Sequence, residues 1–442
     1  MKFFHSLKAT FLIAALSLIG ACSDSGEIQS PASVSAPQTE ITSRQNPLIT
    51  DQSSLDKSFA QIDKYLQDEV DAKIRAGFVT LVAKDGEIIH QSALGMADRE
   101  SALPMSIDTR FRIASMTKPI TSLAILMLME EGKLGLDDPA ADYIPALAKM
   151  RVATSLSFDK NGQIPTTKLQ SPITIRQLLT HTAGLGYLFD FQTDLGKFYL
   201  DNHLYFIEGD LEARINHLAT LPLYTNPGTR WQYSYATDVL GRIVEVLSGQ
   251  NLEAFMQTRI FDPLGMKDTF FLFDETDLEN IATVYAHNEL GEIIPFDGGD
   301  LIKNPNKNGA GWYSGGGGLV STAGDYFKFM QMLINRGALA GKRIISKDSI
   351  DLIMSNHVTA NASPKDWASQ QRGFGLAGWV SIPAGQFGWG GYYDTSFTVD
   401  LDNNLAWMVM AQREPGPFDR PSNAAATLGE GVHNAITKNI NR

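Results

Sequence analysis

The chain has 442 residues, of which 43% are hydrophobic and 19% are charged, and its formal net charge at pH 7 is -12. This is the composition of a globular protein that is long enough for one large domain or two smaller ones. An acidic surface repels phosphate backbones, so the composition argues against a nucleic acid partner.

The first 21 residues predict a targeting segment. Lys2 and Lys8 lie around the start of an apolar run over residues 11–20. This run has the length of a signal-peptide core and is shorter than the ~20 residues that a membrane-spanning helix needs. We therefore expect residues 1–21 to be a signal peptide.

Cys22, the only cysteine in the chain, follows this segment directly, after Ile-Gly-Ala. The arrangement resembles a bacterial lipobox, which predicts lipidation of Cys22 and a membrane anchor in the cell envelope. The alternative is an ordinary signal peptide followed by a chance cysteine. Ser23 stands where an aspartate would indicate inner-membrane retention, which favours an outer-membrane anchor facing the periplasm. Residues 22–50 are rich in Ser, Pro, Gln and Thr and predict a flexible tether.

The remainder, 51–442, predicts one folded hydrolase domain, and its elements follow in chain order. Hydrophobic residues at helical spacing predict a helix over 54–75. Two β-rich runs over 78–95, around Asp85-Gly86, predict a hairpin. A segment that is apolar on nearly all sides, 120–131, predicts a buried helix that ends at Gly132.

Helices and long loops are expected between residues 137 and 310. A capping-box pair, Thr174 and Gln177, predicts a helix that stops at Gly184. Further helices are expected over 236–260 and 322–336, the latter starting at Thr322.

Strands return near the C-terminus. They are expected within 374–382, 386–392 and 396–412, with Asp402-Asn403-Asn404 as the last turn, and a final helix is expected over about 422–437. The order predicts an α+β fold, an antiparallel sheet flanked by helices with a mostly helical insertion. The sheet part is expected over about 51–135 and 310–442, and the insertion over about 136–309.

The pattern Ser-x-x-Lys occurs three times, at Ser54/Lys57, Ser115/Lys118 and Ser157/Lys160. We expect the first pair to cap a surface helix and the third to lie in a turn, so both are interpreted as structural.

Ser115 and Lys118 differ because Pro119 requires a helix to begin near them. An offset of three residues places both side chains on one helix face, in the first turn, where the helix dipole favours negative charge. Burial would desolvate the amine and favour its neutral form, so that Lys118 can activate Ser115 as a nucleophile. A capping serine beside a snorkelling lysine explains these residues equally well.

Four stretches together resemble the serine β-lactamase superfamily, in particular the class C-type enzymes and the family VIII carboxylesterases. They are FRIASMTKPITSLAILMLMEEGKLGLDDP, LLTHTAGLGY, NPGTRWQYSYATDVLGRIVE and GGGGLVSTAGDYFKFMQMLINRG. The resemblance covers about residues 57–415 and implies a β-lactamase/transpeptidase-like fold and an acyl-enzyme mechanism, with Ser115 as nucleophile and Lys118 as its activator.

The resemblance also assigns a tyrosine. The family's Tyr-x-Asn motif reads Tyr233-Ser234-Tyr235 here, which implies that Tyr233 shares the proton transfer with Lys118. Tyr235 replaces the family's asparagine, at a position that contacts substrate. Ser234 and Tyr235 are expected to be structural rather than catalytic.

The family's Lys/His-x-Gly motif reads Trp389-Gly390-Gly391. The resemblance implies that these residues bind substrate and that the backbone N–H groups of Ser115 and Tyr392 form the oxyanion hole. Trp389 replaces a cation, which puts recognition of β-lactam or peptide carboxylates in doubt and is similar to the esterase branch.

Other motifs are interpreted as structural or are absent from the sequence. His181 is expected to support a turn, and Gly315–Gly318 to lead into a strand, because no Gly-Lys-Ser/Thr follows the glycines. The sequence contains no Gly-x-Ser-x-Gly elbow and no metal-binding spacing.

These observations predict a serine hydrolase that needs no cofactor or metal and acts on small uncharged esters. A β-lactamase or a peptidase acting on D-amino-acid or cell-wall peptides is the alternative enzyme, with an amide substrate. The non-enzymatic alternative is a penicillin-binding-like module that has no turnover and acts in envelope assembly.

Overall fold

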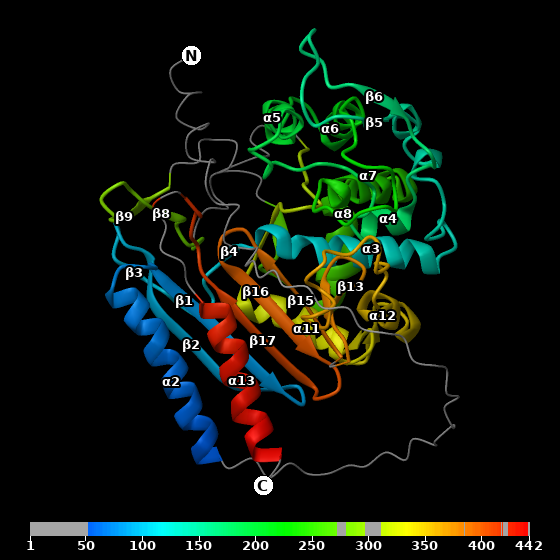
Figure 1. Ribbon diagram of the computed structural model, residues 1–442. Helices are drawn as coiled ribbons and strands as arrows, with labels where there is room; N and C mark the ends of the chain where they lie inside the picture. The colour runs from blue at the N-terminus through cyan, green and yellow to red at the C-terminus, as the bar shows by residue number, and fades with distance from the viewer. Residues whose placement is uncertain are drawn as a thin grey trace, which may run out of the picture.

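The computed structural model describes residues 52–271, 280–296, 311–383, 385–416, 418 and 423–440. Its main feature is an antiparallel sheet of eight strands in the order β13-β14-β15-β16-β17-β1-β2-β3 (Figure 1). In chain order these are β1 (Gly77–Lys84), β2 (Glu87–Asp98), β3 (Leu103–Pro104), β13 (Arg372–Phe374), β14 (Trp379–Ser381), β15 (Gln386–Gly391), β16 (Thr395–Asp400) and β17 (Leu405–Met410). Because β17 pairs with β1, both ends of the chain build one sheet.

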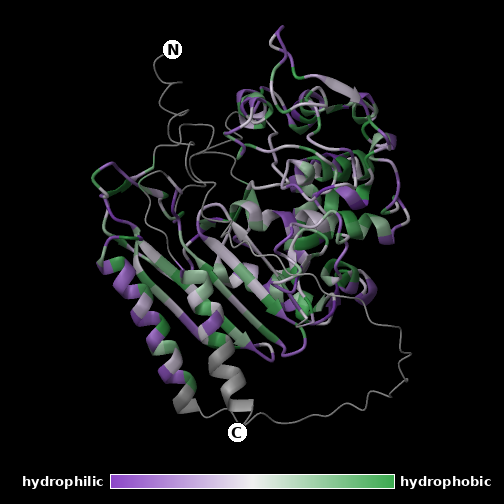
Figure 2. Cartoon of the chain, in the orientation of Figure 1, coloured by the Kyte–Doolittle hydropathy of each residue, from purple (hydrophilic) through white to green (hydrophobic). Residues whose placement is uncertain are grey.

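Two helices cover one face of this sheet. Helices α2 (Gln52–Asp71) and α13 (Ala424–Ile440) lie side by side, with α2 against β2 and α13 against β17 (Figure 1). Figure 2 shows hydrophilic and hydrophobic residues interspersed along α2. Its buried residues recur at helical spacing, as Leu55, Phe59, Ile62 and Leu66. They pack on alternate residues of the strands beneath, because successive side chains of a strand point to opposite faces.

The opposite face of the sheet packs on helix α11 (Ala323–Ile334). Val79 and Leu81 of β1 and Met408 and Met410 of β17 belong to the large core that also contains Phe329 of α11. Strands β1 and β17 are therefore buried on both faces, and the inner face of the sheet continues into the helical part of the molecule.

Helix α3 (Thr117–Glu130) runs between the sheet and a group of helices gathered at the upper right of Figure 1. Twelve residues of α3 are buried, and α3 packs on α7 (Ala236–Ser248). The other helices are α4 (Ile175–Leu179), α5 (Asp194–Asp201), α6 (Leu211–Leu218), α8 (Leu252–Met256), α9 (Asp262–Leu264) and α12 (Lys347–Met354).

The remaining strands form small sheets. They are β4 (Phe111–Arg112), β10 (Leu319–Ser321) and β7 (Phe270–Phe271) in one sheet, and the pairs β5 (Arg151–Ala153) with β6 (Thr166–Lys168), β8 (Tyr285–His287) with β9 (Ile293–Pro295), and β11 (Ala338–Leu339) with β12 (Lys342–Arg343).

The predicted α+β class with an antiparallel sheet flanked by helices is confirmed. Two element predictions were wrong. The helix expected over 236–260 is broken, because Gly249 adopts a left-handed conformation (φ 71°) and ends α7 before α8 begins. The helix that starts with the Thr174–Gln177 capping box ends at Leu179 and does not reach Gly184.

The predicted signal peptide, Cys22 and the tether 22–50 lie outside the described residues. Within the described residues, no helix has the length and apolar character needed to span a membrane.

Candidate active site

Ser115 lies in a 3₁₀ turn, Ala114–Met116, that directly precedes α3. The turn is held against the sheet, because the Thr395 hydroxyl donates a hydrogen bond to the Ile113 carbonyl at 3.3 Å. A Cβ on Gly391 would lie 2.3 Å from the same carbonyl oxygen, so the close approach of β15 to this turn requires glycine. The fold therefore places Ser115 beside the end of β15.

Three of the predicted residues meet at Ser115. The Tyr233 hydroxyl donates a hydrogen bond to Ser115 Oγ at 2.7 Å, and Lys118 Nζ donates one to the same oxygen at 3.2 Å. The expectation that a three-residue offset brings Ser115 and Lys118 together is confirmed. Two groups that can exchange protons thus lie within hydrogen-bond distance of one hydroxyl.

Lys118 is completely buried, and its amino group has a further partner that the sequence did not indicate. Nζ donates a hydrogen bond to the Gly316 carbonyl at 2.6 Å. It also lies 4.7 Å from the ring centroid of Tyr233 and 5.4 Å from that of Tyr187. A buried lysine needs such partners, since an isolated buried charge costs several kcal/mol.

Tyr233 is held by the chain segment that follows α4. The backbone N–H of Gln232 donates to the His181 carbonyl at 2.8 Å, and that of Tyr235 donates to the Gly186 carbonyl at 3.1 Å. Tyr233 lies between these two bonds, so its backbone position is fixed on both sides. The HTAGLG stretch, residues 181–186, therefore supplies the two backbone carbonyls that fix the position of Tyr233.

His181 is buried and supports Tyr233 without contacting Ser115. Its ring lies 4.9 Å from the Tyr233 ring, and its Nδ1 lies 3.1 Å from the Ser234 hydroxyl. Burial, assisted by the Lys118 charge, lowers the pKa of His181 well below its usual value, so the imidazole is neutral near pH 7. The structural interpretation of His181 and Ser234 agrees with this arrangement.

Tyr235, which was predicted to be structural rather than catalytic and to lie at a substrate position, is buried. Its side chain is 1% exposed, and its ring packs 4.4 Å from the ring of Tyr187 in the core. Tyr235 is the N-cap residue of α7, and its side chain belongs to the large hydrophobic core.

The Trp389-Gly390-Gly391 motif forms the end of β15, as expected, and leads to Tyr392. The Trp389 ring lies 5.6 Å from that of Tyr233 and 5.4 Å from that of Phe374. Its indole Nε1 is buried and has no hydrogen-bond partner among the described residues. Trp389 therefore presents an apolar ring to Tyr233 and offers no exposed donor.

An aromatic group continues on the other side of Tyr233. Phe189 lies parallel to Tyr392, with ring centroids 5.8 Å apart, and Tyr187 lies 5.0 Å from Phe189. The surroundings of Ser115 are thus dominated by aromatic side chains, which favour apolar substituents on a ligand.

The other two Ser-x-x-Lys pairs lie elsewhere. Ser54 and Lys57 belong to α2, and Ser157 and Lys160 lie in an exposed loop before β6. Among the described residues, no group of three or more His, Cys, Asp or Glu side chains could hold a metal ion.

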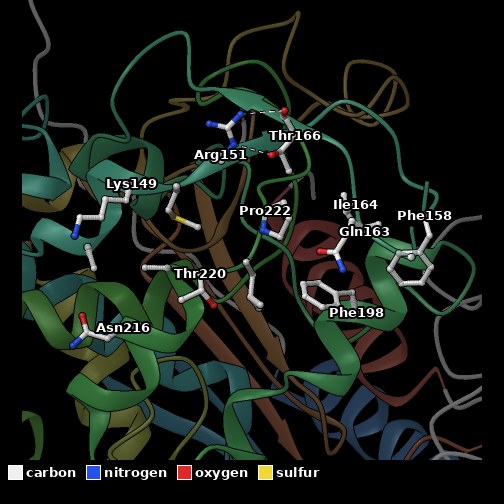
Figure 3. A pocket seen from close by; sticks show the side chains of 15 residues that line it. Lys149, Arg151, Phe158, Gln163, Ile164, Thr166, Phe198, Asn216, Thr220 and Pro222 are labelled. Carbon is white, nitrogen blue, oxygen red and sulfur yellow. Dashed lines mark hydrogen bonds between the residues drawn. The ribbon is translucent and has the colours of Figure 1, made fainter. Parts of the chain in front are cut away.

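A cavity of about 640 Å³ lies apart from this site, between α5, α6 and the β5–β6 pair (Figure 3). Phe158, Phe198 and Pro222 line it together with Arg151, whose guanidinium is hydrogen-bonded to Thr166. None of the residues around Ser115 described above lines this cavity.

Comparison with known proteins agrees with the fold and the site. The Beta-lactamase family model matches residues 62–430, so the chain belongs to this family. A curated relative, Esterase EstB of Burkholderia gladioli, is 32% identical in an alignment of 379 residues that covers 79% of this chain and 89% of EstB. Protein Rv1367c of Mycobacterium tuberculosis is 33% identical over 82% of this chain and 91% of its own.

Solved structures give the same picture. EstCE1, described as a hydrolase with promiscuous acyltransferase activity, has a TM-score of 0.70 and 27% identity, covering 86% of this chain and 99% of its own. Simvastatin synthase of Aspergillus terreus has a TM-score of 0.72 at 23% identity, covering 86% of this chain and 99% of its own. The relatives thus include esterases and acyltransferases, which supports serine-hydrolase chemistry of the esterase kind.

Proposed function

We propose that this protein is a serine carboxylesterase that acts on small uncharged esters through an acyl-enzyme. The observation that carries the proposal is the convergence of Tyr233 and Lys118 on the Ser115 hydroxyl, beside an aromatic surface. A chemical precedent is Esterase EstB, which is 32% identical.

In the first half-reaction, Ser115 Oγ forms a bond to the ester carbonyl carbon while its proton passes to Tyr233 and the Tyr233 proton passes to a neutral Lys118. The carbonyl electron pair moves to the oxygen, where the backbone N–H groups of Ser115 and Tyr392 would stabilise the oxyanion. The ester C–O bond then breaks and the leaving alcohol takes a proton from the Lys118–Tyr233 pair. Water repeats the sequence on the acyl-enzyme and releases the acid.

The aromatic surface supports uncharged substrates. A substrate carboxylate needs a cation or strong donors near the acylated carbonyl. Trp389 stands where the family has a cation, and its only polar hydrogen is on a buried nitrogen. A carboxylated β-lactam or peptide would meet an apolar ring there, whereas a short acyl ester would pack against it.

Acyl transfer to an alcohol is a second candidate, favoured by the relatives that are named methylbutanoyltransferases. Such a reaction shares the acyl-enzyme and replaces water by an alcohol. The aromatic side chains around Ser115 favour acyl transfer, because such a surface retains an alcohol better than it retains water.

The envelope location remains part of the proposal. The lipobox-like Cys22 would attach the protein to a membrane facing the periplasm, with the outer membrane favoured, and the acidic domain would act on small molecules rather than on nucleic acid.

The test compares kcat/KM for p-nitrophenyl butyrate and for a chromogenic cephalosporin with the purified protein. We expect the butyrate to be preferred by orders of magnitude. A preference for the cephalosporin would refute the esterase proposal and support a β-lactamase. If neither is turned over and a fluorophosphonate does not label the protein, the binding-module alternative takes its place.

A further inference from the structure

A buried carboxylate lies beneath the Ser115 site and has no part in the mechanism above. Asp238, in the first turn of α7, is 2% exposed. Its Oδ1 accepts hydrogen bonds from the Ser314 hydroxyl at 2.6 Å and from the Gly316 N–H at 3.1 Å. Both donors belong to the glycine loop, residues 314–318, which leads into β10.

Gly316 connects this carboxylate to Lys118. Its N–H donates to Asp238, and its carbonyl accepts from Lys118 Nζ at 2.6 Å. The loop fits tightly, because a Cβ on Gly316 would lie 2.5 Å from Asp238 Oδ2. A shift of the carboxylate would therefore move the carbonyl that holds the ammonium.

Asp238 also sits among charged and titratable side chains. They are Lys118 on α3, Arg214 on α6, and the tyrosines Tyr187, Tyr205 and Tyr235. Burial raises the pKa of Asp238, whereas the Lys118 charge and the bonds from Ser314 and Gly316 oppose this rise. Lys118 Nζ also lies within hydrogen-bond distance of Ser115 Oγ. Asp238 is therefore linked to Ser115 through the glycine loop and Lys118.

We propose that Asp238 is a positioning residue for Lys118: it fixes the Gly316 carbonyl that receives the ammonium, and its negative charge stabilises that ammonium as Ser115 attacks. The inference rests on the proposed hydrolase function. It names a residue that sets the position of Lys118 and stabilises its protonated form.

The test is Asp238→Asn, which retains an acceptor oxygen for the loop and removes the charge. We expect kcat to fall about 10–100-fold with little change in KM, because the ammonium is less stabilised in the transition state. The acidic limb of the kcat/KM profile should move to lower pH, since removing a nearby anion disfavours the protonated amine.

Asp325→Asn is the matched control. Asp325 is also a buried aspartate that accepts from a backbone N–H, of Asp268 at 2.6 Å, and from the Thr269 hydroxyl, and it pairs with Lys328. Its replacement should lower stability without moving the pH limb.

The proposal is overturned if the pH profile of kcat/KM for Asp238→Asn has the same acidic limb and the same plateau as that of the wild type. It is also overturned if the acidic limb is unmoved and the loss of activity matches the loss of folded protein. If this variant does not fold, Gly316→Ala serves instead. It keeps the charge and displaces the loop, so kcat should fall at least about tenfold. Wild-type kcat in Gly316→Ala would equally overturn the proposal.

Fluorophosphonate labelling of Ser115, measured beside hydrolysis, separates this inference from the proposed function. If the wild-type protein is labelled but does not hydrolyse esters, the esterase function is refuted. The labelling rates of the variants would then still test the role of Asp238. Absence of both in the wild type would refute both.

Discussion

The hydroxyl groups of Tyr233 and Ser115, 118 residues apart in the chain, are joined by a 2.7 Å hydrogen bond. This bond links the helical part of the molecule, where the 181–186 segment brackets Tyr233, to the turn at the start of α3 that carries Ser115. Nucleophile activation therefore depends on how these two parts pack. The predictions below follow from this contact and its surroundings.

Ser115→Ala should abolish ester hydrolysis and leave the fold intact, since a small residue in the 3₁₀ turn disturbs packing little. Hydrolysis of p-nitrophenyl butyrate and thermal unfolding would be measured together. The matched control is Ser157→Ala, in the exposed Ser-x-x-Lys pair, which should retain full activity. Loss of activity in the control but not in Ser115→Ala would show that the wrong motif was chosen.

Lys118→Ala and Tyr233→Phe should each lower kcat about 10²–10⁴-fold, the usual cost of losing a positioned acid or base. Both residues contact the same oxygen of Ser115, so the double variant should be little worse than the poorer single variant. Steady-state kinetics of the wild type, the two single variants and the double variant completes a double-mutant cycle. Losses that multiply would mean that the two residues act independently.

Trp389→Lys should shift specificity towards carboxylated substrates and cost some ester activity, because it restores a cation where the ring now packs on Phe374. The measurement is kcat/KM for one butyrate ester and one cephalosporin. Trp389→Phe is the control that keeps an apolar ring, and its ratio should stay near that of the wild type. An unchanged ratio in Trp389→Lys would refute the assigned role of Trp389.

Stability should fall as pH rises through about 7 because of Glu414. This carboxyl is buried and accepts a hydrogen bond from the Tyr392 hydroxyl at 2.9 Å, and burial raises its pKa from 4.5 to about 7. The folded chain thus holds this proton more tightly than the unfolded chain does. The associated stabilisation is complete below about pH 4.5 and is lost above about pH 7, a difference of about 3 kcal/mol.

Glu414→Gln should remove this dependence, so that the variant gains stability relative to the wild type on going from pH 5 to pH 8. Urea denaturation at both pH values measures it, with the exposed Glu87→Gln as control. A wild type–variant difference that is the same at the two pH values would contradict the assignment.

Cys22→Ser should release the protein from the membrane fraction without changing hydrolysis by the purified domain. The motivation is a lone cysteine directly after an apolar segment. Fractionation of cells and intact mass of the wild type provide the measurement. A soluble wild type that carries no lipid by mass would show that the segment is an ordinary signal peptide.

The sequence predicted the parts of the fold and site that depend on local pattern. The β-rich runs at β1 and β17 and the helical spacing of α2 are local signals, and they predicted these strands and the helix that covers the sheet. The offset of three residues between Ser115 and Lys118 is also local, and the resemblance to a known superfamily added Tyr233.

The sequence did not predict features that arise from packing between distant segments. Asp238 and Gly316 are 78 positions apart, and nothing in either motif indicates that one binds the other. The burial of Tyr235 was not predicted for the same reason, because its ring packs on that of Tyr187 from another segment. The break at Gly249 was missed because hydrophobic spacing continues across it into α8.

The identity of the nucleophile is the central claim, and peptide mapping after fluorophosphonate labelling tests it most directly. The probe forms a stable bond to an activated serine hydroxyl, so the labelled peptide reports which serine is activated. The account predicts one adduct, on Ser115, that is absent from Ser115→Ala and strongly slowed in Lys118→Ala. An adduct on another serine, or ester hydrolysis that continues in a protein without an adduct on Ser115, would contradict it.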